Sequence, residues 1–282
     1  FEYASDFHEG FATIRLDKKW GLLNTKGEIA LPCISEEFIN RYNEICIVKI
    51  NGKYGLTNIS GLAITQYIYD EIKSIEESIA IVRINDKWGF VNTNGAIITD
   101  CIFDNVGSVR DGKFVLFENG FIVLEINGKF GYLTINGISS ECIYDKVEII
   151  FEDLIAIGFN YTNDYGHLRI KFGFFNRDGE QLTEFYFSNY RVLSNDLIAI
   201  EENKSKNDFL LKWGIMSIDG NVLVDCIYDR VKSFNKDIGC IVKFNRKYGI
   251  IDIFGNVKID FIFEEITFLG NKEYLEVNVQ SG

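Results

Sequence analysis

The feature that constrains this chain most is a tripeptide of lysine, an aromatic residue and glycine, which occurs seven times. The glycine of each copy, called the anchor below, stands at Gly21, Gly55, Gly89, Gly131, Gly173, Gly214 and Gly249. A second glycine follows six residues after every anchor, and consecutive anchors are 34 to 42 residues apart. Self-similarity at such a period is typical of tandem repeat proteins. We therefore expect residues 1–282 to form a single repeat domain, because one array is one domain however many copies it holds.

Each copy predicts a meander of short antiparallel strands. In the third copy we expect strands at 70–75, 79–84, 87–92 and 96–103, with Asn85-Asp86 as a two-residue turn. This turn places Arg83 opposite Trp88, and Val82 opposite Gly89. Both faces of the hairpin are then apolar, one bulky and one small, so that repeats must stack to cover them. No sustained 3.6-residue apolar period is present, and the fold class is therefore all-β.

The anchor glycine and its aromatic neighbour each lead to an expectation. We expect an aromatic ring of a neighbouring repeat to approach the glycine, where no Cβ blocks it; a glycine kept for a β-bulge is the alternative. We also expect cation–π contacts across the hairpin. The four pairs in question are Arg15 with Trp20, Lys49 with Tyr54, Arg83 with Trp88, and Lys243 with Tyr248.

The third copy, Lys-Trp-Gly-Phe-Val-Asn-Thr-Asn-Gly followed by Cys-Ile-Phe-Asp, resembles the WG (or KWG) repeat of bacterial proteins. All seven copies fit, over nearly the whole chain. The first and fifth copies depart from the pattern at 33–36 and 185–188. The resemblance implies a β-rich repeat module and brings no catalytic residues with it.

The two ends of the chain bear on how the array is arranged. Residues 1–16 and 263–279 supply the same half of a repeat rather than complementary halves. A closed propeller usually completes its last blade with strands from both termini. We therefore favour an open, twisted, solenoid-like array over a closed seven-bladed propeller, although repeats of four short strands have the size of propeller blades.

Charge and motifs exclude several classes of function. The formal net charge of −12 argues against a nucleic-acid partner. The sequence contains no run of 18 apolar residues, so no membrane span is predicted. The two histidines, His8 and His167, stand outside any metal-binding or nucleophile motif. We therefore expect no enzyme activity, no cofactor and no metal.

Two rows of charged residues repeat in step with the anchors. Lysine precedes every anchor by two residues, and an acid follows six of the seven anchors by 14 or 15: Glu36, Asp70, Asp104, Asp145, Asp229 and Glu264. We interpret the two rows as partners of each other, or the acids as acceptors for turn N–H groups. A lysine row for an anionic polymer and an acidic row for calcium are the alternatives.

The six cysteines fall into two repeated positions. One position holds tyrosine or phenylalanine in the other copies, and the second, that of Cys46 and Cys240, is matched with Ala12, Ala80, Ala156 and Ala199. Positions that accept such residues need apolar volume, so we expect buried free thiols, with inter-repeat disulfides as the alternative. Free thiols favour the cytoplasm. Because the sequence begins at Phe1 within a repeat, we also expect it to have been processed or cut from a longer chain.

The lengthened copies are the best indication of function in the sequence. The fourth, fifth and sixth copies carry extra residues within 111–121, 160–167 and 203–208. Tyr161, Tyr165 and His167 are the predicted partner-binding residues, because they are aromatic or amphipathic and stand in a polar loop. The predicted function is a non-catalytic binding or scaffolding module with a protein partner, of unknown oligomeric state. The alternative is a lectin-like array for carbohydrate or small ligands, which solvent-facing tryptophan rings would favour.

Overall fold

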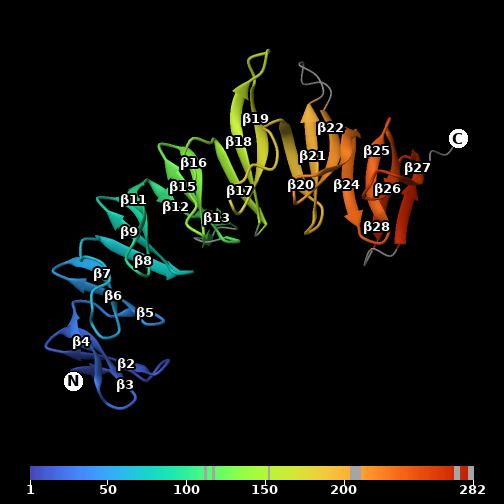
Figure 1. Cartoon of the computed structure of the whole chain (residues 1–282). Coiled ribbons are helices and arrows are strands. Elements are labelled where there is room, and N and C mark those ends of the chain that lie inside the picture. Colours follow the sequence, from blue (N-terminus) through green and yellow to red (C-terminus); the bar gives the residue numbers. More distant parts are fainter. Residues whose placement is uncertain (111–112, 116–117, 152, 204–210, 270–273, 279–282) are drawn as a thin grey trace. The chain divides into compact units, whose positions relative to one another are not determined.

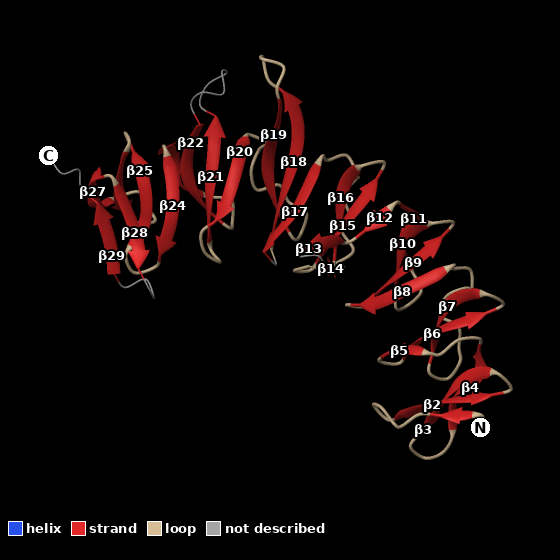
Figure 2. Ribbon diagram, turned by 180° about the vertical axis from the view of Figure 1, so that it is seen from behind, coloured by secondary structure: helices blue, strands red, loops and turns tan. Residues whose placement is uncertain are grey.

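Every regular element of the described chain is a β-strand. The computed structural model describes residues 1–110, 113–115, 118–151, 153–203, 211–269 and 274–278, and these contain no helix (Figure 2). They divide into two compact units: unit one holds residues 1–117 and 124–127, and unit two holds 118–123 and 128–282. None of the described sheets closes into a barrel. The predicted fold class, an all-β array of tandem meanders, is confirmed.

The strands follow one another at the repeat period in both units (Figure 1). Those of unit one are β1 (Tyr3–Ala4), β2 (Phe11–Leu16), β3 (Lys19–Asn24), β4 (Ile29–Ser35), β5 (Asn40–Tyr42), β6 (Ile45–Ile50), β7 (Lys53–Asn58), β8 (Glu71–Glu76), β9 (Ile79–Ile84), β10 (Lys87–Asn92), β11 (Ile97–Phe103), β12 (Asn105–Val106), β13 (Ser108–Arg110) and β14 (Lys113–Val115). The residues of β15 (Phe121–Ile126) are divided between the units. Those of unit two are β16 (Lys129–Thr134), β17 (Lys146–Phe151), β18 (Leu154–Thr162), β19 (Leu168–Asn176), β20 (Phe187–Val192), β21 (Leu197–Asn203), β22 (Leu211–Ser217), β23 (Val222–Tyr228), β24 (Arg230–Asn235), β25 (Gly239–Phe244), β26 (Lys247–Ile251), β27 (Val257–Phe263), β28 (Glu265–Leu269) and β29 (Tyr274–Asn278).

The third repeat shows the pattern of the sheets. Its four strands pair in the order β11-β10-β9-β8, each with its neighbour in the chain. In the hairpin β9–β10, Arg83 lies opposite Trp88 and Val82 opposite Gly89, as predicted. Asn85 and Asp86 both have positive φ, 51° and 63°, the conformation of the two-residue turns that match strand twist. The strand boundaries differ from the expected ones by no more than one residue.

The two faces of the hairpins pack in the predicted way. In unit one, Ala80 and Val82 of the small face of β9 cluster with Leu56 on the hairpin of the preceding repeat. In unit two, Phe172 and Phe174 on the bulky face of β19 cluster with Ile198, Ile200 and Met216 of the next hairpin. Each contact removes apolar surface on both sheets from water, and this burial stabilises the fold by about 25 cal/mol per Å² of apolar surface. Stacking of a bulky face on the glycine-bearing face of the next repeat is therefore confirmed.

The prediction that a neighbouring repeat's ring approaches the anchor glycine is wrong. A Cβ added to Gly89 would lie 2.8 Å from the amide nitrogen of Cys101 and 2.9 Å from the carbonyl of Asp100, both on β11 of the same sheet. The pairing of β10 with β11 shifts register here, with Trp88 opposite Phe103 but Phe90 opposite Thr99. The bulge folds the backbone of β11 over the glycine, as the alternative proposed.

In the third and sixth repeats the second glycine lies close to the backbone or side chain of the preceding repeat. Gly95 and Gly220 have φ of +87° and +82°, which side chains rarely adopt. A Cβ on Gly95 would lie 2.3 Å from the carbonyl oxygen of Ile64, and one on Gly220 would lie 2.7 Å from Cβ of Leu182. Both contacts come from the preceding repeat, from the residues between its second glycine and its last aromatic residue. We call this part of each repeat the edge segment. Turn conformation and close approach therefore require glycine at the same position.

All six cysteines are free thiols, as predicted. Cys46, Cys226 and Cys240 are buried, whereas Cys33, Cys101 and Cys142 are only half-buried. Burial raises the pKa of the Cys46 thiol to about 11 and that of Cys240 to about 12. The matching of Cys46 with Ala156 and Ala199 is wrong by one residue. Cys46 lies opposite the second residue after its anchor, whereas these two alanines lie opposite the first and so face the other side of their sheets.

Candidate functional site

The lysine and acid rows pair with each other, as interpreted from the sequence. Six ion pairs join the lysine before an anchor to the acid after it: Lys19–Glu36, Lys53–Asp70, Lys87–Asp104, Lys129–Asp145, Lys212–Asp229 and Lys247–Glu264. In five of them the acid also accepts a backbone N–H from the next hairpin turn, for example that of Asn85 onto Oδ2 of Asp70 at 2.8 Å. Each of these five pairs therefore ties one hairpin to the next.

These contacts leave the two rows little capacity for an outside ligand. The Lys53 ammonium and the Asn85 N–H hold the pKa of Asp70 below its ordinary value. Lys87 and Asn127 do the same for the pKa of Asp104. Within the residues that the structure describes, no group of three or more His, Cys, Asp or Glu side chains is placed to hold a metal ion. The geometry favours the interpretation of the rows as partners over both alternatives.

The fifth repeat lacks the acid and replaces its contact. Ser188 stands where the pattern has Asp or Glu. Nζ of Lys171 instead lies 4.9 Å from the ring centroid of Tyr161, on the lengthened hairpin. Tyr161 is half-buried and pairs with Arg169 across the two strands. The inserted residues thus give this lysine an aromatic contact in place of an ion pair.

The other two predicted binding residues lie at the exposed tip of this hairpin. β18 and β19 pair over nine residues each and extend past the ends of neighbouring strands (Figure 1). Oδ1 of Asn163 accepts the N–H groups of Tyr165 and His167 and so fixes the turn. Tyr165 is 56% exposed, and His167 is also exposed. The structure therefore brings Tyr165 and His167 together at the tip and places Tyr161 on the shaft.

The other two lengthened regions can be described only in part. In the fourth copy, β13 and β14 form a short added hairpin with Val109 opposite Phe114. Residues 111–112 and 116–117 of that region, and 204–208 of the sixth copy, lie outside the described residues.

In the part of the chain that the structure describes, cations cover five of the seven aromatic residues before the anchors: Trp20, Tyr54, Trp88, Phe172 and Tyr248. All four predicted pairs are confirmed, with a charge-to-centroid distance of 5.3 Å for Arg15 over Trp20 and 5.2 Å for Arg83 over Trp88. Trp20 also meets Tyr3 and Phe38 edge-on. Trp20, Trp88 and Trp213 are half-buried. The rings of Trp20 and Trp88, covered in this way, do not present the open faces that a lectin needs to stack sugars.

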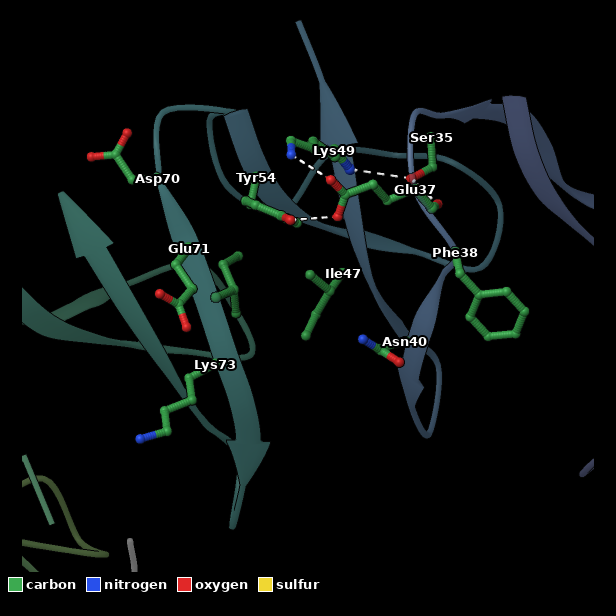
Figure 3. A pocket seen from close by; sticks show the side chains of 11 residues that line it. Ser35, Glu37, Phe38, Asn40, Ile47, Lys49, Tyr54, Asp70, Glu71 and Lys73 are labelled. Carbon is green, nitrogen blue, oxygen red and sulfur yellow. Dashed lines mark hydrogen bonds and ion pairs between the residues drawn. The ribbon is translucent and has the colours of Figure 1, made fainter. Parts of the chain in front are cut away.

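A polar pocket of about 380 Å³ lies in unit one between the second and third repeats (Figure 3). Glu37 accepts hydrogen bonds from Nζ of Lys49 and Oη of Tyr54, both at 2.5 Å. Lys49 and Tyr54 lower the pKa of Glu37. On the opposite wall, Glu71 pairs with Arg83 at 2.7 Å. The charges of Glu37, Lys49 and Glu71 in this pocket are therefore paired within the protein.

A row of exposed apolar side chains, one per repeat, forms a second candidate surface. Its members stand one residue before the last aromatic (in the first copy, Ser35) of the edge segment: Ile34, Ile68, Ile102, Ile143, Tyr186, Ile227 and Ile262. We call them the edge row. All except the half-buried Ile34 are 40–56% exposed. Outward positions of half-buried strands are usually polar, so the recurrence of apolar side chains is unusual.

Five members of the edge row are accompanied by an exposed acid two residues earlier, on the same side of the segment. These acids are Asp100, Glu141, Glu184, Asp225 and Asp260. Within the described part of the chain their side chains take part in no ion pair or hydrogen bond. They therefore differ from the row of acids that follow the anchors by 14 or 15 residues, all of which are paired with lysines. Four of the five acid–apolar pairs lie in unit two, in consecutive repeats.

The sequence contained a signal for the edge row that was not used. Cys101, Ile102 and Phe103 alternate inward, outward and inward, so that Ile102 stands at a position where a polar residue is expected. The same apolar outward position recurs in all seven copies. Attention to the alternation, rather than to the lengthened loops, would have identified it.

Repeat period, stacked meanders and an internally paired ladder define the class as an all-β tandem repeat array. The family model described as "WG containing repeat" matches residues 1–20, 20–54, 55–88, 88–120, 172–204, 213–248 and 248–279. The chain therefore belongs to the WG-repeat family. The matches omit residues 121–171, where the structure nonetheless holds the Lys129–Asp145 pair of the fourth copy.

Other comparisons add little. No curated protein matches the chain. Among solved structures, a eukaryotic initiation factor is similar at 11% identity and a TM-score of 0.37, over 96% of this chain and 78% of that one. Hsv2p of Kluyveromyces lactis is similar at 13% identity and a TM-score of 0.28, over 98% and 97%. The N-terminal domain of Nup159 is similar at 10% identity and 0.30, over 88% and 85%. Likenesses this weak carry no argument about function. No helix in the described residues has the length and apolar composition to cross a bilayer.

Proposed function

We propose that this chain is a non-catalytic binding module that holds a protein partner along the edge-row residues of unit two, Ile143, Tyr186, Ile227 and Ile262. The observation that carries the proposal is the recurrence of an exposed isoleucine or tyrosine at one position of successive repeats. Exposed apolar side chains that recur in this way mark interaction surfaces. A repeat array presents such positions in series, so that weak contacts add along an extended partner.

The acids beside the edge row give the partner its chemistry. Acids on an edge segment are commonly explained as protection against edge-to-edge pairing. That explanation does not account for the isoleucine or tyrosine beside each acid. An acid followed two residues later by an apolar side chain complements a surface with basic and apolar groups in alternation. The proposed partner is therefore a basic protein segment, in keeping with the net charge of −12. The free thiols fit a reducing compartment, and we place the protein in the cytoplasm.

Substitutions of the edge row test the proposal. The triple variant Ile143→Thr, Ile227→Thr and Ile262→Thr keeps β-branched residues at exposed positions, so the fold should be retained. We expect it to lose at least about tenfold of the affinity for partners captured from lysate of the native host, since each lost apolar contact contributes on the order of 1 kcal/mol. The control is Leu168→Thr, which removes an apolar side chain that is 67% exposed on the lengthened hairpin.

The comparison of the two variants decides between the surfaces. Partners lost by the triple variant and kept by Leu168→Thr support the edge row. Partners lost by Leu168→Thr and kept by the triple variant would assign binding to the hairpin tip with Tyr165 and His167, and would refute the edge row.

A further inference from the structure

A groove in unit two contains an arginine that no carboxylate of the described chain balances. The groove measures about 480 Å³ and lies between the first strands of three consecutive repeats, β20, β24 and β28. Arg191 forms one wall, with Ser233 and Thr267 as further polar groups, and Phe234 and Phe268 supply apolar surface. None of these residues belongs to the edge row or to the lengthened hairpin.

Among the residues that the structure describes, one partner is found for the guanidinium of Arg191. Nη2 donates to the carbonyl oxygen of Val231, and the structure describes no ion pair for this side chain. The charged group with the largest electrostatic effect on Arg191 is another cation, Arg230. Partial burial and the positive charge of Arg230 both lower the pKa of Arg191. The neighbouring Lys232 is fully engaged, since its Nζ contacts Glu265, the Ile266 carbonyl and Oγ1 of Thr267.

Other charged groups in comparable positions of the array are paired. Glu148 has the same cross-strand position one repeat earlier, because it lies opposite Ala156 as Arg191 lies opposite Ala199. That carboxylate accepts a hydrogen bond from Oη of Tyr190 and an ion pair from Lys146 at 2.8 Å. In unit one, Arg41 also stands on a first strand, and it pairs with Glu9 at 2.7 Å and lies over the ring of Phe11. Arg191 therefore differs from Glu148 and Arg41, whose charges are paired within the protein.

A half-buried guanidinium without a counter-charge is costly to maintain, and a bound anion removes that cost. A second hollow of about 510 Å³ adjoins the groove, with which it shares the walls Leu193 and Phe234. An inorganic ion would fill only the arginine end of it. An extended peptide would place a carboxylate on Arg191 and apolar side chains against Phe234 and Phe268.

We propose that this groove is a binding site for a peptide segment in which a carboxylate neighbours an apolar side chain, with Arg191 as the carboxylate-binding residue. The occupant is a second protein segment, distinct in charge from the basic segment of the edge row. The proposal shares with the proposed function only that the occupant is a protein. Its test uses purified full-length chain, so that its failure would leave the edge row untouched.

The first arm uses 4-fluorophenylacetate as a probe, followed by ¹⁹F line broadening. We expect broadening that saturates at millimolar concentration and binding at least about tenfold weaker for Arg191→Gln, because this variant loses the charged hydrogen-bond donor to the carboxylate. Arg191→Lys should recover part of the binding because it restores the charge. Arg41→Gln is the matched control, since its charge already has a partner, and it should bind the probe as the unsubstituted chain does. The neutral 4-fluorophenylacetamide should bind at least about tenfold more weakly than the acid.

The second arm identifies the source of the carboxylate by displacement of the probe. An acetylated tripeptide ending in free phenylalanine tests a C-terminal carboxylate, and acetyl-Phe-Glu-Leu-amide tests a side-chain carboxylate. Displacement by either peptide supports the proposal and says which source the groove prefers. Displacement by inorganic phosphate but by neither peptide would overturn it. Equal binding of the acid and the amide, or unchanged binding to Arg191→Gln with an unchanged urea midpoint, would also overturn it.

Discussion

Replacement of Gly89 by alanine tests the close approach of β11 to the anchor. The added Cβ would lie 2.8 Å from the amide nitrogen of Cys101, whereas ordinary contact begins at 3.4 Å, so β11 must move by 3.4 − 2.8 = 0.6 Å. The obstacle is backbone at a bulge, which cannot rotate away as a side chain can. Such overpacking costs about 1–3 kcal/mol. The φ of Gly89 is not positive, so alanine recovers about 0.5–1 kcal/mol of conformational entropy. The net loss of unfolding free energy should be about 1–2 kcal/mol, and Gly89→Val should lose more.

Gly52→Asn is the control for this substitution. Gly52 has a φ of +77° and no atom within 4 Å of an added Cβ, and asparagine tolerates this conformation. Its cost should stay below about 0.5 kcal/mol. The measurement is the urea midpoint followed by tryptophan fluorescence, because Trp88 adjoins the substituted glycine. Equal midpoints for Gly89→Ala and Gly52→Asn would refute the account of the anchor, since the bulged strand would then not confine it.

Three further predictions concern the pairing ladder, the lengthened hairpin and the thiols. Asp70→Asn should lower the urea midpoint at neutral pH. Because the pKa of Asp70 is lowered in the folded protein, the difference in midpoint between this variant and the unsubstituted chain should persist above the ordinary carboxyl pKa of 3.8. It should disappear as the pH falls through the lowered pKa of the folded state. A difference that stays constant down to pH 2 would contradict the ion pair. Replacing residues 161–170 by one glycine joins Asn160 to Lys171 through the Asn-Gly turn that other copies use. The free energy of unfolding from urea titration should therefore fall by less than about 1 kcal/mol. Loss of cooperative unfolding would show that the hairpin is part of the core. Alkylation of the unfolded, unreduced chain should modify all six cysteines in mass spectrometry, and two or more protected cysteines would show a disulfide.

The local geometry could be predicted because it depends on neighbours in the sequence. A two-residue turn at Asn85-Asp86 fixes which residues face each other, and the cation–π pair of Arg83 with Trp88 follows from that register alone. The Lys53–Asp70 pair was inferred from equal numbers of opposite charges repeating in step. The positions of the residues predicted to bind a partner were harder to infer. Tyr161 was chosen as a loop residue, yet it lies on a strand against Lys171, because the inserted residues continue the hairpin rather than leave it.

The sequence by itself determined the repeat, the meander, the strand register and the stacking of a bulky face on a small one. All of these follow from side-chain alternation and turn chemistry within about 40 residues of chain. Tertiary structure decided what the glycines are for. Gly89 makes room for a bulged strand of its own sheet, and Gly95 makes room for the carbonyl of Ile64. The close approach of two backbones cannot be recognised from a pattern of apolar and polar residues. It also decided which charges are left over. Arg41 and Arg191 both stand on first strands, and only their three-dimensional surroundings give Glu9 to Arg41 and, among the described residues, no carboxylate to Arg191.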